Sequence, residues 1–255
     1  MDFNHTVDKK GIPVVNILGV NIAAINMDWL LRFTTEHISD LSGDYICVSN
    51  VHTTVMSHED DSYKAVQNGG IMAIPDGGPL SSVGRKRGAT NMSRTTGPSY
   101  MGEILKISAQ YGWKHYFYGS TQETLDKLKA ELEKKYPGVQ IVGMYSPPFR
   151  PMTEEEDEKT IEVINATNPN FLWVGLGAPK QEKWMAAHQG RIKGLMVGVG
   201  AAFDYYAGNI KRAPEWMQKS NLEWVYRLMQ DPKRLWKRYF VTNSKFIWNA
   251  VIRGK

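Results

Sequence analysis

Short apolar runs, each followed by a break in the pattern, recur along the chain from residue 14 to residue 199. A continuous apolar run of four to eight residues that ends in a turn is typical of a strand buried in a parallel sheet. The first two runs flank Gly19 and predict a hairpin. We expect strands over residues 14–18, 20–25, 45–48, 71–74, 115–118, 139–143, 171–174 and 195–199.

Segments with apolar positions at helical spacing separate these runs. We expect helices over residues 28–38, 54–67, 100–111, 121–136 and 153–165, the last beginning with a Thr-Glu-Glu-Glu capping box. Strand and helix alternate at about 20–30 residues per unit, which is typical of a doubly wound sheet. The pattern therefore predicts an α/β fold with a Rossmann-like, mainly parallel sheet.

Two of the strands run into glycine-rich turns, residues 175–180 (GLGAPK) and 198–202 (GVGAA). Ligands of open α/β sheets bind at the carboxyl edge, where these turns would lie side by side. Glycines let backbone N–H groups approach a phosphate, and the start of the next helix favours an anion. The turns predict a site for a phosphorylated ligand, although tight turns under a packed helix have the same pattern.

Two other loops belong to the same edge. Residues 75–79 (PDGGP) follow a predicted strand, and we expect no regular structure to continue through them. Residues 85–98 are polar, basic and glycine-containing, and they indicate a mobile loop on the ligand side.

The pattern changes after Gly208, where strands stop and basic, tryptophan-rich helices begin. Residues 209–255 hold eleven Lys/Arg and three Asp/Glu, a net charge of +8; the whole chain carries +5, so the remainder carries −3. We therefore expect an α/β domain over residues 1–208 and a basic helical appendage over 209–255.

The last helix of this tail begins at Asp231-Pro232. Such a basic, aromatic helix can pack on its own domain, lie in a membrane interface or bind nucleic acid. The apolar positions that fall at helical spacing are Leu235, Trp236, Tyr239, Phe240, Ile247 and Val251.

Composition narrows the class of protein. The chain has 255 residues, 42% hydrophobic and 22% charged, which is ordinary globular composition. Its single cysteine excludes a disulfide framework and a cysteine-built zinc site. The polar first residues lack a secretory signal, and the longest apolar run is too short to cross a bilayer. We expect a protein that is soluble or lies on a membrane without spanning it.

Several long motifs resemble a known family. They are PDGGPL at 75–80, Arg94 with Gly97-Pro98, LGAPKQEKW at 176–184, GVGAAFDYYAGNIKRAPEW at 198–216 and LEWVYRLMQDPKRLWKRY at 222–239. Together they resemble the WecG/TagA/CpsF glycosyltransferases, glycosyltransferase family 26, over residues 14–240.

The resemblance implies a bacterial, inverting, metal-independent enzyme with a Rossmann-like domain and a C-terminal helical appendage. Such enzymes move a sugar from a UDP-sugar to a polyprenyl-diphosphate-linked saccharide for capsule, exopolysaccharide or teichoic acid. The implied location is cytoplasmic, peripheral on the inner face of the plasma membrane, in contact with its anionic surface. No cofactor other than the donor substrate is expected.

The resemblance also implies catalytic residues. The candidate base is Asp76, which could take the proton of the attacking hydroxyl; an Asp before two glycines is also an ordinary turn residue. A family hydroxyl is replaced here by Val48, which leaves Ser49 or Thr53 as candidates. The family's Asp after Gly-Pro is replaced by Ser99, which weakens a role for that position.

The chain contains no Asp-x-Asp metal motif, so fixed cations or amides would have to stabilise the departing UDP. The expected donor-binding residues lie in the strand-end motifs and the tail. They are Asn50, Gly119, Ser120, Gly175, Gly177, Pro179, Lys180, Gln181, Glu182, Gly200, Asp204, Arg212, Arg227 and Arg234.

Two other classes of protein compete with this interpretation. A dinucleotide oxidoreductase would need an early Gly-x-Gly-x-x-Gly, which the late glycine turns do not complete. A nucleic-acid-binding module would need aromatics displayed on a sheet or groove, whereas four tail tryptophans at helical spacing suit burial or membrane contact better. The sequence leaves open the donor sugar, the acceptor and the oligomeric state, a homo-oligomer included.

Overall fold

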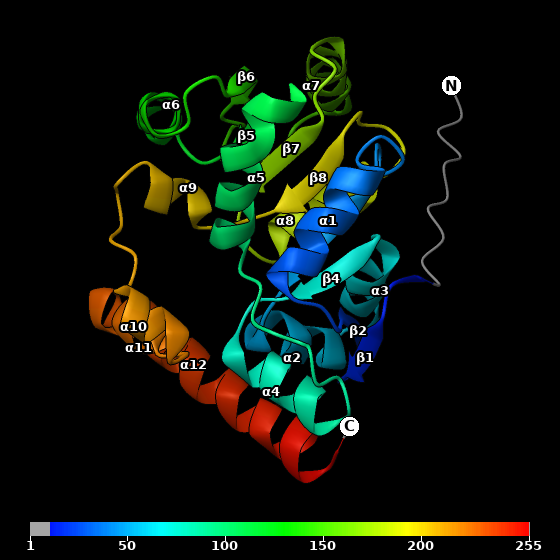
Figure 1. Ribbon diagram of the computed structural model, residues 1–255, viewed down its shortest axis with the longest axis vertical. Coiled ribbons are helices and arrows are strands. Elements are labelled where there is room, and N and C mark those ends of the chain that lie inside the picture. Colours follow the sequence, from blue (N-terminus) through cyan, green and yellow to red (C-terminus); the bar gives the residue numbers. More distant parts are fainter. Residues whose placement is uncertain (1–10, 255) are drawn as a thin grey trace.

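An eight-stranded sheet forms the centre of the protein (Figure 1). A computed structural model describes residues 11–254, except for the side chains of Lys219, Arg234 and Arg238. The strand order is β1-β2-β4-β3-β8-β7-β5-β6; β1 and β2 pair antiparallel, and the other described pairs are parallel. The strands are β1 (Val14–Ile17), β2 (Val20–Ala23), β3 (Tyr45–Ser49), β4 (Met72–Pro75), β5 (Lys114–Gly119), β6 (Gln140–Tyr145), β7 (Phe171–Gly175) and β8 (Leu195–Gly198). The predicted Rossmann-like α/β fold and its opening hairpin are confirmed.

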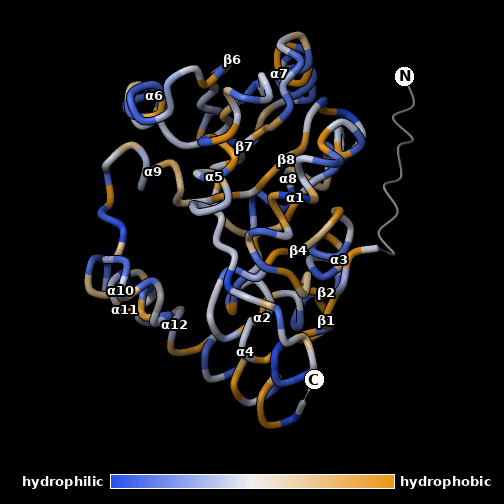
Figure 2. Tube along the Cα trace, in the orientation of Figure 1, coloured by the Kyte–Doolittle hydropathy of each residue, from blue (hydrophilic) through white to orange (hydrophobic). Residues whose placement is uncertain are grey.

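Helices cover both faces of the sheet and enclose two hydrophobic clusters. One face carries α1 (Met27–His37), α5 (Gly97–Tyr111), α6 (Gln122–Lys135) and α9 (Ala202–Tyr206). The other carries α2 (Val51–Glu59), α3 (Asp61–Gly69), α4 (Gly78–Lys86), α7 (Glu154–Ala166) and α8 (Lys180–Ala187). The central strands β4, β7 and β8 are mostly hydrophobic along their length, because both of their faces are covered (Figure 2).

The helix predicted over residues 54–67 is two helices, α2 and α3. The helical conformation is interrupted at Asp60, whose backbone is extended (φ −135°, ψ 105°). The Asp60 carboxylate accepts hydrogen bonds from the N–H groups of Ser62 and Tyr63 at the start of α3. An Asp that caps a new helix competes with continuation of the old one. The apolar pattern alone does not show this break.

We expected no regular structure to continue through residues 75–79, but this is wrong from Gly78 onward, where α4 begins. Gly77 takes φ 146°, a conformation that glycine adopts readily, and α4 begins at Gly78 with Pro79 in its first turn. Proline is favoured at this position because its missing N–H would have no partner inside the helix. The turn is therefore short, and it joins β4 directly to a helix.

The segment after Gly208, here called the appendage (residues 209–254), lies along α2 and α4 (Figure 1). Its helices are α10 (Glu215–Lys219), α11 (Glu223–Gln230) and α12 (Pro232–Phe246), followed by a π-helical segment, Ile247–Ile252. Leu235, Phe246 and Ala250 are buried, the last two within the second hydrophobic cluster. Lys245 also pairs with Glu59 of α2.

α12 and the π-helical segment after it have two apolar sides, one that packs on the domain and one that is exposed. The predicted apolar side buries Leu235 but leaves Trp236, Phe240, Ile247 and Val251 at least 48% exposed. The side that packs on the domain uses Phe246 and Ala250 instead. Both domain packing and an exposed aromatic surface are thus present in the same segment. None of the helices within residues 11–254 has the length and apolar character needed to cross a bilayer.

Candidate active site

The order of the strands creates an opening at the carboxyl edge of the sheet. The adjacent strands β3 and β8 are followed by helices on opposite faces, α2 and α9, and such a switch point leaves a crevice between the two connections. The start of α5 closes one side of it. A Cβ on Gly97 would lie 3.3 Å from the Val199 Cα, so the backbones approach closely there.

Asp76 stands at this edge, in the turn between β4 and α4. Its N–H donates to the Ser49 carbonyl oxygen over 2.7 Å, which extends the β3–β4 ladder by one step and fixes the position of the residue. Two residues later, Gly78 lines a cavity of about 350 Å³. Asp76 itself lies outside the described lining, but the charges of Arg94 and Arg212, which do line the cavity, act on its carboxyl. A carboxylate is therefore held near the cavity, at the end of a buried strand.

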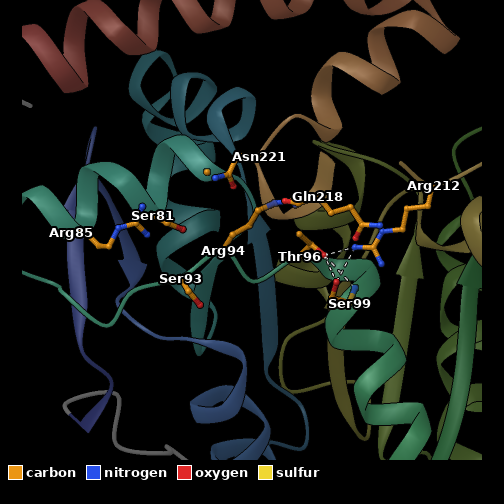
Figure 3. A pocket seen from close by; sticks show the side chains of 10 residues that line it. Ser81, Arg85, Ser93, Arg94, Thr96, Ser99, Arg212, Gln218 and Asn221 are labelled. Carbon is orange, nitrogen blue, oxygen red and sulfur yellow. Dashed lines mark hydrogen bonds between the residues drawn. The ribbon is translucent and has the colours of Figure 1, made fainter. Parts of the chain in front are cut away.

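Three arginines line the cavity, Arg85, Arg94 and Arg212 (Figure 3). Arg85, in the last turn of α4, donates through Nη1 to the Met92 carbonyl oxygen at 3.0 Å. Arg212, from the appendage, donates through Nη2 to the Ser99 and Thr96 hydroxyls at 2.8 and 3.2 Å. Arg94, from the loop between α4 and α5, donates through Nη1 to the Gln218 carbonyl oxygen at 3.1 Å. Arginine is well suited to phosphate, because its planar group donates two parallel hydrogen bonds.

Glu223, in the first turn of α11, joins two of these arginines. Its two carboxylate oxygens accept from Arg94 Nη2 and, at 3.4 Å, from Arg212 Nε. The Glu223 side chain is only 12% exposed. The appendage thus supplies both a cation and an anion to the edge of the domain.

Burial and the surrounding charges together set the pKa of Asp76. The pKa of the carboxyl is raised from 3.8 to about 6: burial, the largest effect, and Glu223 raise it, whereas Arg94, Arg212 and Arg227 lower it. A base with a pKa just below neutral is ionised at pH 7 yet still basic enough to accept a proton. This environment distinguishes Asp76 from an ordinary turn residue.

Arg227 lies near this group but outside the lining of the cavity. Its Nη1 donates to the Tyr205 hydroxyl at 2.6 Å, and its guanidinium stands 5.3 Å from the centre of that ring. Lys180 is exposed at the start of α8. The side chain of Arg234 lies outside the described residues, so its expected contact with the donor stays a prediction.

The candidate hydroxyls turn inward. Ser49 is fully buried and donates to Gln67 Oε1 at 2.5 Å. Asn50 and Thr53 form a capping box at the start of α2, in which Asn50 Oδ1 accepts from the His52 and Thr53 N–H groups. These contacts hold the end of β3 and the start of α2, and they give Ser49 a structural role.

The glycine turns are tied together by one side chain. Gln181 Oε1 accepts from the N–H groups of Gly177 and Gly200, each at 3.1 Å. Gln181 Nε2 donates to Glu182, which is fully buried. Two of the amides expected to face a phosphate are therefore engaged inside the protein, and the carboxylate of Glu182 lies beneath the surface rather than on it.

The remaining predicted residues are not among those that line the arginine-lined cavity. Gly119 contacts the backbone of Gly175, since a Cβ on Gly119 would lie 2.7 Å from it. The Ser120 carbonyl accepts from the Ser146 hydroxyl, and Asp204 accepts from the Asn209 side chain. Pro179 precedes α8.

Sequence reasoning missed two members of the charged group. Arg94 was named only as part of a motif, although its basic loop was expected on the ligand side; Glu223 carried no signal beyond its place in LEWVYRL. Ser99, whose role was doubted, accepts a hydrogen bond from Arg212. Among the described residues, no group of three or more His, Cys, Asp or Glu side chains could hold a metal ion.

Comparison with known proteins decides the family. A model of the glycosyl transferase WecG/TagA/CpsF family matches residues 15–255. The chain belongs to this family. The expected family and the expected glycosyltransferase activity are thereby confirmed, and neither the oxidoreductase nor the nucleic-acid-binding alternative is favoured.

Two curated relatives cover most of this WecG/TagA/CpsF chain. A Bacillus subtilis protein is 28% identical over 236 residues, 92% of this chain and 87% of its own. A Staphylococcus aureus protein is 26% identical over 231 residues, 89% of each chain. Both are named N-acetylglucosaminyldiphosphoundecaprenol N-acetyl-beta-D-mannosaminyltransferase.

Proposed function

We propose that this protein transfers a sugar from a UDP-sugar to a polyprenyl-diphosphate-linked saccharide, as a step in the synthesis of a bacterial cell-surface polysaccharide. The chain belongs to a family of glycosyltransferases. The observation that carries the proposal is the position of Asp76 near a cavity whose lining includes Arg94 and Arg212. The names of the relatives suggest N-acetylmannosamine as the first donor sugar to test. They also suggest N-acetylglucosaminyl-diphospho-undecaprenol as the first acceptor.

The reaction is proposed as a single displacement with inversion. A hydroxyl oxygen of the acceptor forms a bond to the anomeric carbon of the donor while the bond from that carbon to the UDP oxygen breaks. Asp76 accepts the hydroxyl proton, and UDP leaves with the electron pair. A general base of this kind contributes about 10²–10⁴-fold to turnover.

The charge that develops on UDP needs a positive partner. Arg94 and Arg212 face the cavity and supply fixed positive charge beside Asp76, with Arg227 close to them. Preorganised cations of this kind stabilise a departing phosphate without having to move during the reaction. They support a metal-independent mechanism, as does the absence of Asp-x-Asp from the sequence.

The appendage is proposed as the contact with the anionic inner surface of the plasma membrane. It exposes the aromatic residues Trp216, Trp224, Trp236, Phe240 and Trp248. Residues 209–255 also carry a net charge of +8. Basic residues near an anionic leaflet contribute about 1 kcal/mol each, and tryptophan favours the boundary between water and lipid. A polyprenyl acceptor would be met at that surface.

The test is a UDP-release assay with a panel of UDP-sugars and a short-chain polyprenyl-diphosphate N-acetylglucosamine, with and without EDTA. We expect one UDP-N-acetylhexosamine to be turned over, with UDP raising the melting temperature in EDTA. Turnover that stops on chelation and returns with a divalent ion would refute the metal-free mechanism. Stabilisation by NADH, with no UDP release from any donor, would refute the proposed reaction.

A further inference from the structure

Glu223 is an acidic residue at a site that should bind an anion. It lies in the first turn of α11 with its side chain 12% exposed, and both of its oxygens are used by Arg94 and Arg212. A carboxylate so placed either competes with a phosphate for the arginines or prepares them to bind one. The remaining contacts of the two arginines distinguish these roles.

The described contacts hold each guanidinium at two of its nitrogens. Arg212 is held by Glu223 at Nε and by Ser99 and Thr96 at Nη2. Arg94 is held by Glu223 at Nη2 and by the Gln218 carbonyl at Nη1. Contacts on two sides of a planar group fix its plane, and a fixed guanidinium loses less conformational entropy when it binds a phosphate.

Both arginines also line the cavity, so the contacts with Glu223 leave their side chains facing it (Figure 3). Arg94 comes from the domain and Arg212 from the appendage, and Glu223 is the described side chain that contacts both. Its bridge therefore sets the spacing between two cations that belong to different parts of the chain.

We propose that Glu223 is a positioning residue for the donor, which holds Arg94 and Arg212 at the spacing and orientation needed to bind the two phosphates of a UDP-sugar. The proposal rests on the proposed function, since it concerns the diphosphate of that donor. Glu223 acts through the arginines and takes no part in bond making or breaking.

Charge balance supports the same role. The charged groups that act on Asp76 are Arg94, Arg212, Arg227 and Glu223. Without Glu223, three cations would surround one carboxylate, and they would favour its ionised, less basic form. Glu223 offsets one of these charges, and it raises the pKa of Asp76 in addition to the effect of burial.

The experiment compares Glu223→Gln, Glu223→Asp and a control, Glu131→Gln, which removes the same charge from the exposed side of α6. Each full-length variant is assayed for UDP affinity by calorimetry, for KM of the donor, for kcat and for the pH profile of kcat/KM. Melting temperatures report folding. The shorter Asp keeps the charge but loses reach, whereas Gln keeps the reach but loses the charge.

We expect Glu223→Gln to raise the donor KM and the UDP dissociation constant about 10- to 100-fold, the scale of a lost charge-assisted hydrogen bond. The acid limb of its pH profile should move to lower pH, because a negative charge near Asp76 that raises its pKa is gone. Glu223→Asp should raise KM while leaving the acid limb near its wild-type position. Glu131→Gln should match wild type.

Tighter UDP binding by Glu223→Gln would overturn the proposal and show that Glu223 competes with the donor. If Glu223→Gln changed neither KM nor the pH profile and only lowered the melting temperature, the proposal would also be overturned. The ion pairs of Glu223 would then serve only to hold the appendage on the domain. These outcomes differ from a failure of the proposed function, in which wild-type protein itself neither binds UDP nor releases it from a UDP-sugar.

Discussion

The sheet and the appendage are built on different physical principles. The strands end in residues that the core fixes from both faces, and Asp76 is held there by a backbone hydrogen bond to β3. The appendage packs on the domain with one side only: Phe246 and Ala250 are buried, while Trp236 and Trp248 remain more than half exposed. The base of the proposed reaction thus belongs to the part of the molecule that is packed on both faces.

The groups that would bind the leaving UDP are shared between these two regions. Arg94 belongs to the domain, and Arg212 and Glu223 belong to the appendage. Under the proposed mechanism, bond making and breaking depend on the sheet, whereas donor affinity depends on how the appendage is docked. Substitutions in the two regions should therefore change different kinetic constants.

The largest effect is expected at Asp76. Asp76→Asn should lower kcat about 10²–10⁴-fold because the proton acceptor is lost, while UDP affinity stays within about twofold. Steady-state kinetics and calorimetry measure the two quantities, with Asp126→Asn on the exposed side of α6 as the control. Wild-type turnover in Asp76→Asn would leave this residue as part of a turn and remove the contrast between the two regions.

A smaller effect is expected at the arginines. Arg94→Gln and Arg212→Gln should each raise the UDP dissociation constant about 10- to 100-fold, equivalent to about 1.4–2.8 kcal/mol. Arg191→Gln removes an exposed ion pair with Glu158 and should change little. If both cavity variants bound UDP as wild type does, the diphosphate would have to bind Arg85, the third arginine of the cavity lining, or lie elsewhere along the edge, for example beside Lys180.

Substitutions on the exposed side of the appendage should weaken membrane binding without changing turnover. Trp236→Ser should lower partition onto anionic vesicles about tenfold, equivalent to about 1.4 kcal/mol, because partial burial of one large apolar side chain contributes somewhat less than the roughly 1.5–3 kcal/mol of full burial. Turnover of a water-soluble acceptor should be unchanged. Val163→Ser, at a similarly exposed apolar position on α7, is the matched control. Equal losses in vesicle sedimentation for both variants would argue against a membrane-facing appendage.

The smallest effect concerns pH. The Asp76 carboxyl has a pKa of about 6 in the folded protein against 3.8 ordinarily, so kcat/KM should fall about tenfold per unit below pH 6. The folded state binds the proton more tightly, so this group favours folding below pH 3.8 and loses that contribution as pH rises through 6. Asp76→Asn should therefore become more stable relative to wild type between pH 4 and 7, as melting curves can show. A constant difference across that range would contradict the raised pKa.

Much of the fold could be predicted from the sequence because its signals are local. Strands such as β7 and β8 are covered on both faces and read as apolar runs, and glycines mark where they end. The break at Asp60 and the start of α4 at Gly78 were missed, because each depends on a cap or a proline position that competes with the apolar pattern. The division at residue 208 stays a prediction.

For the candidate site, the sequence by itself determined the Asp76 turn, the basic tail and the family motifs. The tertiary structure alone decided which charges meet. Arg94, Arg212 and Glu223 are separated by 11 to 129 positions, and their contacts exist only because the appendage docks beside α5 and α4. It also decided that Gln181 takes the Gly177 and Gly200 amides, since the turns of two different strands must come together for one side chain to bond both. Hydrogen bonds and ion pairs form between neighbours in space, and sequence patterns report only neighbours along the chain.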